Sequence, residues 1–76
     1  TLLRQGHFLG SKLRSLRKRN GLTLDELSAR CVQLDAARAP SVSFLSMVET
    51  GKRVPSTELL ELLARVFGKP RDWFLD

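Results

Sequence analysis

Apolar residues recur along this chain at intervals of three and four, and three of these stretches end at a glycine. The first apolar stripe consists of Leu9, Leu13 and Leu16. This spacing is that of a helix that buries one face, and glycine is the residue best able to adopt the left-handed conformation that stops a helix. Gly21, Gly51 and Gly68 hold these stop positions. Because no segment alternates apolar and polar residues as a strand would, the sequence predicts an all-α fold.

Helix start signals divide the chain into five helical segments. Thr23, with Glu26 three residues later, forms a capping box. Ser41 and Ser56 are good N-caps, and Pro70 suits the first turn of a helix. The predicted helices cover residues of about 8–19, 24–32, 42–50, 56–67 and 71–75. We therefore expect an N-terminal arm at residues 1–7 and one compact five-helix domain at residues 8–76.

The composition favours a polyanionic partner and gives no support to catalysis. The 76 residues carry 13 Lys and Arg against 8 Asp and Glu, a formal net charge of +5. Ten of these cations lie in residues 1–53, where only four acids occur, so we expect the basic surface there. The sequence has no Gly-rich phosphate loop, metal-ligand cluster or paired Ser and His. We therefore expect no enzyme activity, no cofactor and no metal site.

Cysteine usage and hydropathy favour a cytoplasmic protein without a membrane partner. Cys31 is the only cysteine, so an internal disulfide cannot form and a small buried apolar role is the simplest one. No apolar run reaches the roughly 18 residues needed to span a bilayer. The chain begins at Thr1 rather than Met, so we expect a longer protein that can carry a further domain beyond Asp76.

Residues 43–56 are the most informative about function. They read Ser-Phe-Leu-Ser-Met-Val-Glu-Thr-Gly-Lys-Arg-Val-Pro-Ser. Leu45 and Val48 share one helix face, which serines flank, and Lys52 and Arg53 follow the helix end. A short helix with small polar side chains on its exposed side suits a DNA groove, with nearby cations holding phosphates at the rim.

A second segment strengthens this interpretation. Residues 13–28 read Leu-Arg-Ser-Leu-Arg-Lys-Arg-Asn-Gly-Leu-Thr-Leu-Asp-Glu-Leu-Ser. The order and spacing of the two segments resemble the Cro/C1-type (XRE) helix-turn-helix family, over about residues 8–75. The resemblance implies a lambda-repressor-like fold whose recognition helix, residues 42–50, enters the major groove of double-stranded DNA. It further implies a homodimer on two-fold sites about one turn apart, in a bacterial transcriptional regulator associated with the nucleoid.

By this resemblance, the exposed side chains of the recognition helix contact base edges. Three align with family positions that face bases, and Ser46 lies beside them; the set is Val42, Ser43, Ser46 and Met47. No Gln, Asn or Arg stands ready for a bidentate base contact, so we expect modest sequence specificity. Core packing is the alternative for Val42 and Met47. Phe44 either joins the core or lies along the sugar-phosphate wall.

Candidate phosphate contacts surround that helix. They are Thr23, Arg38, Ser41, Thr50, Lys52 and Arg53. Hydroxyls, cations and the N-termini of helices bind phosphates and set the affinity for DNA rather than the choice of sequence. The alternative for Lys52 and Arg53 is that they form a charged surface that only contacts solvent. The loop at residues 33–40 is about seven residues longer than the family's usual tight turn. This loop either carries Arg38 toward a phosphate, or its extra length is simply tolerated at a small entropic cost. Residues 35–38 could add one helical turn within it.

Arg17 and Glu49 match family positions that form an internal ion pair. A partly buried pair would fix the angle of the recognition helix, whereas an exposed pair would contribute little. Trp73 either seals the core or meets a second copy or a following domain. The remaining cations of the first helix are Arg14, Lys18 and Arg19. We expect them to maintain solubility, and DNA contact is the alternative.

A protein-interaction module is the alternative function. Antitoxins and adaptor proteins use the same helical fold against another protein. Binding that weakens steeply with salt and depends on DNA sequence would favour the regulator, and flat, weak DNA binding would favour the interaction module.

Overall fold

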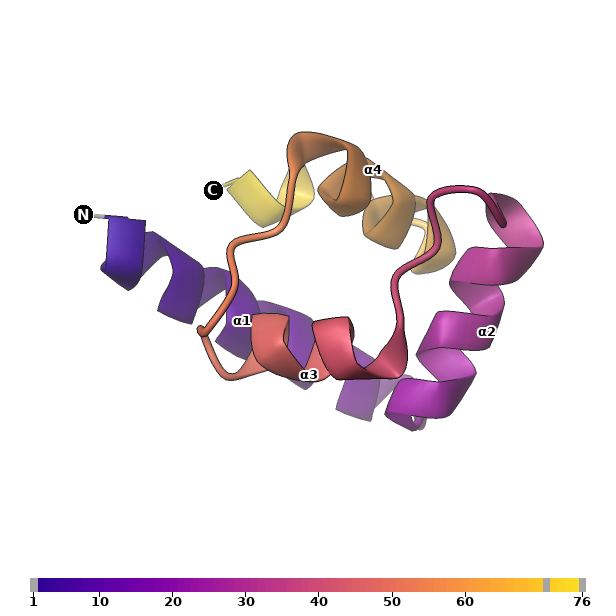
Figure 1. The fold of residues 1–76 in the computed structure, drawn as a ribbon, viewed down its shortest axis with the longest axis horizontal. Coiled ribbons are helices and arrows are strands. Elements are labelled where there is room, and N and C mark those ends of the chain that lie inside the picture. Colours follow the sequence, from indigo (N-terminus) through magenta and orange to yellow (C-terminus); the bar gives the residue numbers. More distant parts are fainter. Residues whose placement is uncertain (1, 71, 76) are drawn as a thin grey trace.

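Four α-helices and one 3₁₀ turn build the chain in its computed structural model, which describes residues 2–70 and 72–75 and the side chains of residues 8–70 and 72–74. In chain order the elements are α1 (Leu2–Arg19), α2 (Leu24–Leu34), α3 (Val42–Glu49), α4 (Thr57–Val66) and the 3₁₀ turn η1 (Trp73–Leu75). No strand occurs among these residues, so the predicted all-α class is confirmed. Figure 1 shows α3 lying in front of α1, with α2 at one end of both and α4 above them.

The prediction of five helices was wrong in its last element. Instead of an α-helix over residues 71–75, the chain forms only η1, in which the Trp73 N–H donates to the Pro70 carbonyl at 3.0 Å. This bond to the third preceding residue winds the chain more tightly than an α-helix does. The turn places Phe74 in the core at 1 % exposure, with the Trp73 ring packed edge to face against it.

The first helix is longer than predicted at its start. It begins at Leu2 rather than near Phe8, so residues 2–7 are helical instead of forming a separate arm. Residues 2–5 are good helix formers, and a helix that has nucleated gains one hydrogen bond for each residue added. At the end of α2, no stop signal precedes Asp35, and the helix continues two residues past its predicted end. The bounds of α3 and α4 shift by one residue because Thr50, Ser56 and Phe67 act as caps.

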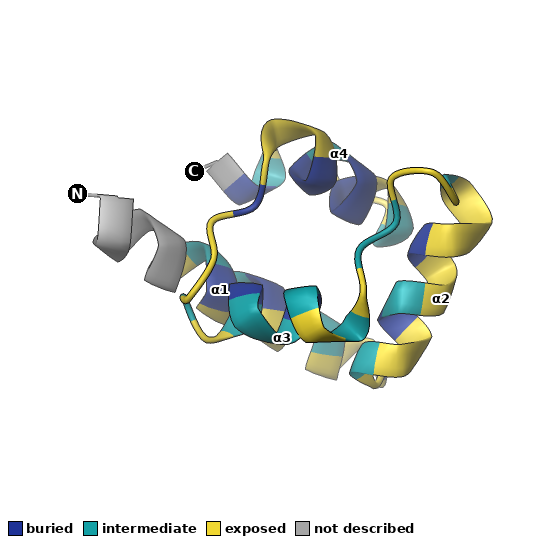
Figure 2. Cartoon of the chain, in the orientation of Figure 1, coloured by how far each residue is buried: buried dark blue, intermediate teal, exposed yellow. Residues whose placement is uncertain are grey.

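All five elements contribute to one apolar core. Its buried residues are Leu13, Leu16, Leu27, Cys31, Leu45, Val48, Leu59, Leu60, Leu62, Leu63, Ala64 and Phe74. Five of them belong to α4, whose buried turns are dark blue in Figure 2, whereas the outer side of α2 is exposed. None of the described helices is long and apolar enough to cross a membrane.

Gly51 ends α3 and fixes the chain that follows it. Its φ is 80°, the left-handed region. The Gly51 N–H donates to the Val48 carbonyl at 3.1 Å and the Lys52 N–H donates to the Met47 carbonyl at 2.9 Å. These paired bonds are typical of a helix that stops at a left-handed glycine. They hold Lys52 beside the last turn of α3.

Residues 35–41 connect α2 to α3. The Arg38 N–H donates to the Asp35 carbonyl at 3.2 Å, so residues 35–38 form a hydrogen-bonded turn and not an additional helix. Ser28 Oγ donates to the Pro40 carbonyl at 2.9 Å, which ties the middle of α2 to the residue before the Ser41 N-cap. This bond fixes the point from which α3 starts.

Candidate nucleic-acid interface

The solvent side of α3 carries a small, mostly polar face. Its side chains follow one another at i, i+3, i+4 and i+7 and are Ser43, Ser46, Met47 and Thr50. Ser43 and Thr50 are exposed, while Ser46 and Met47 are half-buried. On the opposite side of the helix, Leu45 is 0 % exposed and Val48 is 1 % exposed. Two apolar anchors therefore hold α3 to the core and leave the serine side free.

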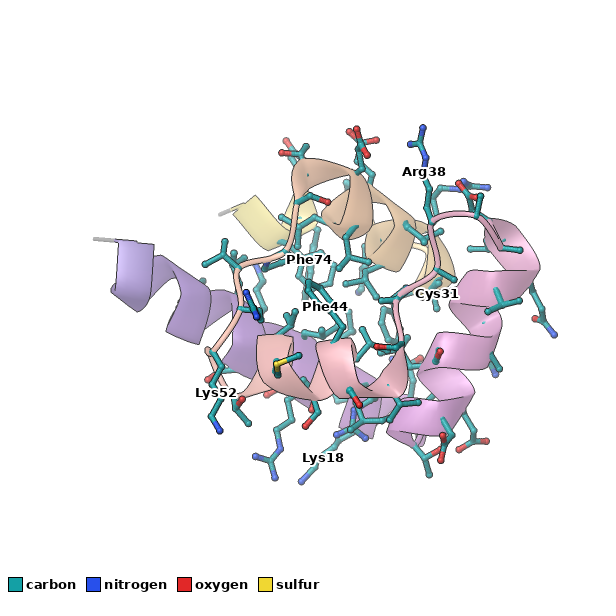
Figure 3. All side chains as sticks on the ribbon, viewed as in Figure 1. Lys18, Cys31, Arg38, Phe44, Lys52 and Phe74 are labelled. Atoms are coloured by element: carbon teal, nitrogen blue, oxygen red, sulfur yellow. The ribbon has the colours of Figure 1, made fainter. Side chains whose placement is uncertain are left out.

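The apolar side chains of α3 divide between core and surface. Phe44 packs against the core cluster, and Figure 3 shows it pointing from α3 into the interior. This position excludes a place along the sugar-phosphate wall. Val42 and Met47 are half-buried, and neither is among the partly buried residues that pack on the cluster. Both side chains therefore lie at the surface of α3 rather than in the core.

An ion pair fastens α3 to α1. Arg17 Nε donates to Glu49 Oε2 at 2.6 Å, and Arg17 Nη2 donates to Glu49 Oε1 at 2.9 Å. The third guanidinium nitrogen, Nη1, donates to the Leu22 carbonyl at 2.8 Å. The two side chains are only 12 % and 6 % exposed, and the hydrogen bond to Glu49 raises the pKa of Arg17 further. The internal pair implied by the family resemblance is therefore present, and it fixes the end of α3 relative to α1.

Two exposed cations follow α3 directly, and a third lies beside it. Lys52 and Arg53 are exposed next to the last turn. Figure 3 shows Lys52 at one end of α3 and Lys18 along the same edge of the molecule. Among the described side chains, neither Lys18 nor Lys52 has a carboxylate within 4.0 Å. Their charges are thus available to a partner that approaches the α3 face.

Comparison with known families identifies this arrangement. A family model for the helix-turn-helix domain matches residues 9–73, from α1 to the first residue of η1. The chain belongs to the helix-turn-helix domain family. This assignment bears out the resemblance to the Cro/C1-type domains. No curated protein and no solved structure gave a significant match.

Two hydroxyls at the ends of α3 differ in their availability in this helix-turn-helix domain. Ser41 Oγ accepts a hydrogen bond from the Phe44 N–H at 3.1 Å, which leaves its own hydrogen free to donate. Thr50 Oγ1 donates to the Ser46 carbonyl at 3.1 Å and to the Met47 carbonyl at 3.2 Å. Thr50 must therefore give up these bonds before its hydroxyl can donate to a phosphate.

The start of α2 is already occupied by a carboxylate. The Thr23 N–H donates to Glu26 Oε1 at 2.9 Å, and Thr23 Oγ1 accepts from the Glu26 N–H at 3.1 Å. The hydrogen bond from the Thr23 N–H lowers the pKa of Glu26, with the side-chain bond adding to it. Asp25 adds a second acid to the first turn. The Glu26 carboxylate already occupies the capping groups of Thr23, so this helix start suits phosphate less well than predicted.

Arg38 lies apart from the other predicted contacts. Its Nε is 3.8 Å from Asp35 Oδ2, and its Nη1 is 4.0 Å from Glu58 Oε2 on α4. Figure 3 places Arg38 on the opposite side of the molecule from Lys18 and Lys52. The structure therefore gives Arg38 a link between the 35–41 loop and α4 and does not bring it to the α3 face.

Two cations of α1 lie near the α3 face. Arg14 and Lys18 are exposed and lie four residues apart, forming a row beside Arg17, whose side chain reaches α3. Their spacing of three residues and one residue from Arg17 places them on the same side of α1 as that side chain. Arg19 belongs to another side of α1.

The described part of the chain offers no candidate metal site. Among the described residues, no three His, Cys, Asp or Glu side chains form a group that could hold a metal ion. Cys31 is fully buried in the core, and burial raises the pKa of its thiol to about 11. The cysteine therefore has the packing role expected of it.

Proposed function

We propose that this chain is the DNA-binding domain of a bacterial transcriptional regulator, with α3 as the recognition helix in the major groove. The observation that carries this proposal is the solvent-facing serine side of α3, held to the core by Leu45 and Val48 and to α1 by the Arg17–Glu49 pair. A rigidly mounted helix with a free polar face is what groove insertion requires. The protein acts in the cytoplasm, on the nucleoid.

The α3 face contacts base edges with little discrimination. Ser43 and Ser46 exchange donor and acceptor roles and therefore tolerate several bases. Val42 and Met47 press on thymine methyl groups or exclude water. The remaining specificity comes from DNA shape and deformability, because no side chain on this face makes a bidentate contact.

Phosphates on either side of the groove bind the cations around α3. Lys52 and Arg53 contact the backbone beyond the C-terminal end of α3, and Ser41 donates its hydroxyl hydrogen at the N-terminal end. Lys18 and Arg14 extend the basic edge along α1. Two copies bind two-fold related half-sites about one helical turn apart, as the family resemblance implies.

Selection of duplexes from a random DNA pool tests this function. We expect an enriched consensus with two-fold symmetry, and loss of its binding when Ser43→Glu places a carboxylate on the α3 face. Thr57→Glu is the matched control, because both positions are exposed in the first turn of a helix, where an acid is tolerated. If no motif is enriched, or if the two variants reduce DNA binding equally, the proposed function is wrong and the protein-interaction module becomes the better explanation.

A further inference from the structure

A shallow groove runs along the side of α1 that faces away from α3. It has a volume of about 370 Å³ and is lined by Phe8, Ser11, Lys12, Ser15, Leu16, Arg19 and Trp73. Gly10 and Arg17 are residues of α1 that contact α3. Each comes two residues after a residue that lines the groove, Phe8 or Ser15. Two residues correspond to just over half a turn around an α-helix. The groove and the recognition helix therefore lie on opposite sides of α1.

The groove combines apolar walls with positive charge that no carboxylate of the described residues balances. Phe8 is 55 % exposed and Trp73 is half-buried. Lys12 Nζ lies 4.3 Å from the centroid of the Trp73 ring, and Lys69 Nζ lies 5.4 Å from it. Among the described side chains, neither ammonium group has a carboxylate within 4.0 Å. Two cations thus share one aromatic ring beside an open apolar surface.

We propose that this groove is a docking site for a segment of a partner protein that carries large apolar side chains flanked by carboxylates. Phe8, Leu16 and Trp73 receive the apolar side chains, whose burial drives association. Lys12 and Lys69 pair with the carboxylates at one end of the groove, and Arg19 pairs with them at the other. Such charge-assisted bonds are stronger than neutral ones and select an acidic partner.

Charge complementarity also argues against a second copy of this chain as the occupant. An isologous pair would place the Lys12 and Arg19 of one copy against those of the other, with no acid among the lining residues to compensate. Nucleic acid fits poorly as well. The rings of Phe8 and Trp73 form walls of the groove, whereas phosphates would need hydrogen-bond donors there. DNA held by α3 leaves the groove open, so both partners can bind at once.

The single tryptophan makes docking directly measurable. Trp73 is the only Trp and the chain has no Tyr, so its fluorescence reports on the groove alone. A displayed library of random peptides is selected on the 76-residue chain, and the most enriched peptide is titrated against it. We expect enriched peptides that combine acidic with large apolar residues, and a saturable change in Trp73 emission.

Variants locate the binding site. We expect the affinity for that peptide to fall about tenfold or more in Phe8→Ala and in Arg19→Gln, two exposed positions, as is usual for interface anchors. Arg14→Gln is the matched control, because it removes the same charge from the other side of α1 and should leave peptide affinity unchanged. Saturating the chain with its selected DNA should not displace the peptide, and the peptide result stands if no DNA motif is found.

Several results would overturn the proposal. Selected peptides without acidic residues would contradict an acidic partner. Peptide affinity that is unchanged in both Phe8→Ala and Arg19→Gln would contradict binding in this groove. Self-association in sedimentation equilibrium that Phe8→Ala abolishes would assign the groove to a second copy. Loss of DNA affinity in Arg19→Gln as large as that in Arg14→Gln would assign the groove to nucleic acid.

Discussion

Gly10 of α1 lies directly against the main chain of Val48 in α3. A Cβ atom added to Gly10 would lie 2.3 Å from the Val48 carbonyl oxygen and 2.7 Å from that of Glu49. Real Cβ atoms essentially never come within 3.0 Å of another heavy atom, and here both neighbours are backbone atoms that cannot rotate away. Helix α3 can therefore approach α1 this closely only because position 10 has no side chain.

Gly10→Ala should destabilise the fold, although the same change elsewhere in a helix is favourable by about 0.5–1 kcal/mol. We expect the free energy of unfolding in urea to fall by about 1–3 kcal/mol, the usual cost of overpacking, because α3 must move away from α1. DNA affinity should fall with it. Ser15→Ala, an exposed position on the same helix, is the control and should leave stability unchanged or slightly raised. A more stable Gly10→Ala protein would contradict the close contact.

The Arg17–Glu49 pair should behave as one unit in a double-mutant cycle. Arg17→Met leaves Glu49 nearly buried without a partner, so we expect a loss of about 3 kcal/mol in the free energy of unfolding. Glu49→Leu should cost a similar amount, and the double variant should recover a large part of the sum, because a buried pair replaced by apolar residues is often nearly neutral. Arg14→Met, at an exposed position, should change stability little. Strictly additive losses would mean that the pair is not coupled.

Local signals predicted most of the helices but not every end. The Thr23–Glu26 capping box and the Gly51 stop lie within a few residues of the ends they define, so the sequence alone was sufficient there. The start of α1 was placed six residues too late. The last segment was expected to be an α-helix because Pro70 suits a first turn. The need to bury Phe74 and pack Trp73 on it was not visible in the local pattern.

Some site residues could likewise be predicted from local spacing or the family resemblance, whereas others depend on contacts between distant parts of the chain. The polar side of α3 follows from helical spacing, and its ion pair to Arg17 follows from the family resemblance. Arg38 pairs with Glu58, twenty positions further along the chain. Only the folded chain therefore reveals that the Arg38 side chain lies beside α4 and away from α3. The groove likewise forms only when Trp73 returns to α1, 61 residues from Lys12.

Removal of single cations should distinguish phosphate contacts from general charge. Lys52→Ala and Arg53→Ala should each reduce the slope of log K against log salt concentration by about 1, if each neutralises one phosphate. Arg38→Ala removes the same charge on the far side of the molecule and should leave the slope unchanged. The measurement is fluorescence anisotropy of labelled duplex over a salt series. Equal changes in all three variants would point to net charge rather than to contacts beside α3.

The Cys31 thiol should be protected in the folded protein. Burial raises its pKa from 9.0 to about 11, which alone lowers the thiolate fraction about hundredfold at neutral pH. We expect alkylation by iodoacetamide to be at least about a hundredfold slower in the native chain than in urea, measured by mass spectrometry near pH 8. Comparable rates in both states would contradict the burial of this side chain.

The same shift makes stability fall at alkaline pH. The fold prefers the neutral thiol, whereas the unfolded chain loses its proton near the ordinary pKa of 9.0. The contribution is therefore complete below that pKa and is lost as the pH rises toward about 11. Cys31→Ala should unfold more easily but show a flatter dependence of its melting temperature above pH 9.0. A curve as steep as that of the wild type would assign the loss to other groups.

Glu26 should make the start of α2 sensitive to acid. Because the Thr23 N–H holds its carboxylate, the pKa of Glu26 lies below its ordinary value, and the unfolded state binds a proton first as the pH falls. The capping-box contribution is therefore complete above the ordinary glutamate pKa of about 4.3 and is lost as the pH falls through the lower pKa of the folded chain. Glu26→Gln keeps an acceptor for the Thr23 N–H but cannot titrate, so its melting temperature should fall less steeply in this range. Thermal unfolding followed by circular dichroism at a series of acidic pH values gives the comparison, and parallel curves for the two proteins would show that the carboxylate does not act as this helix cap.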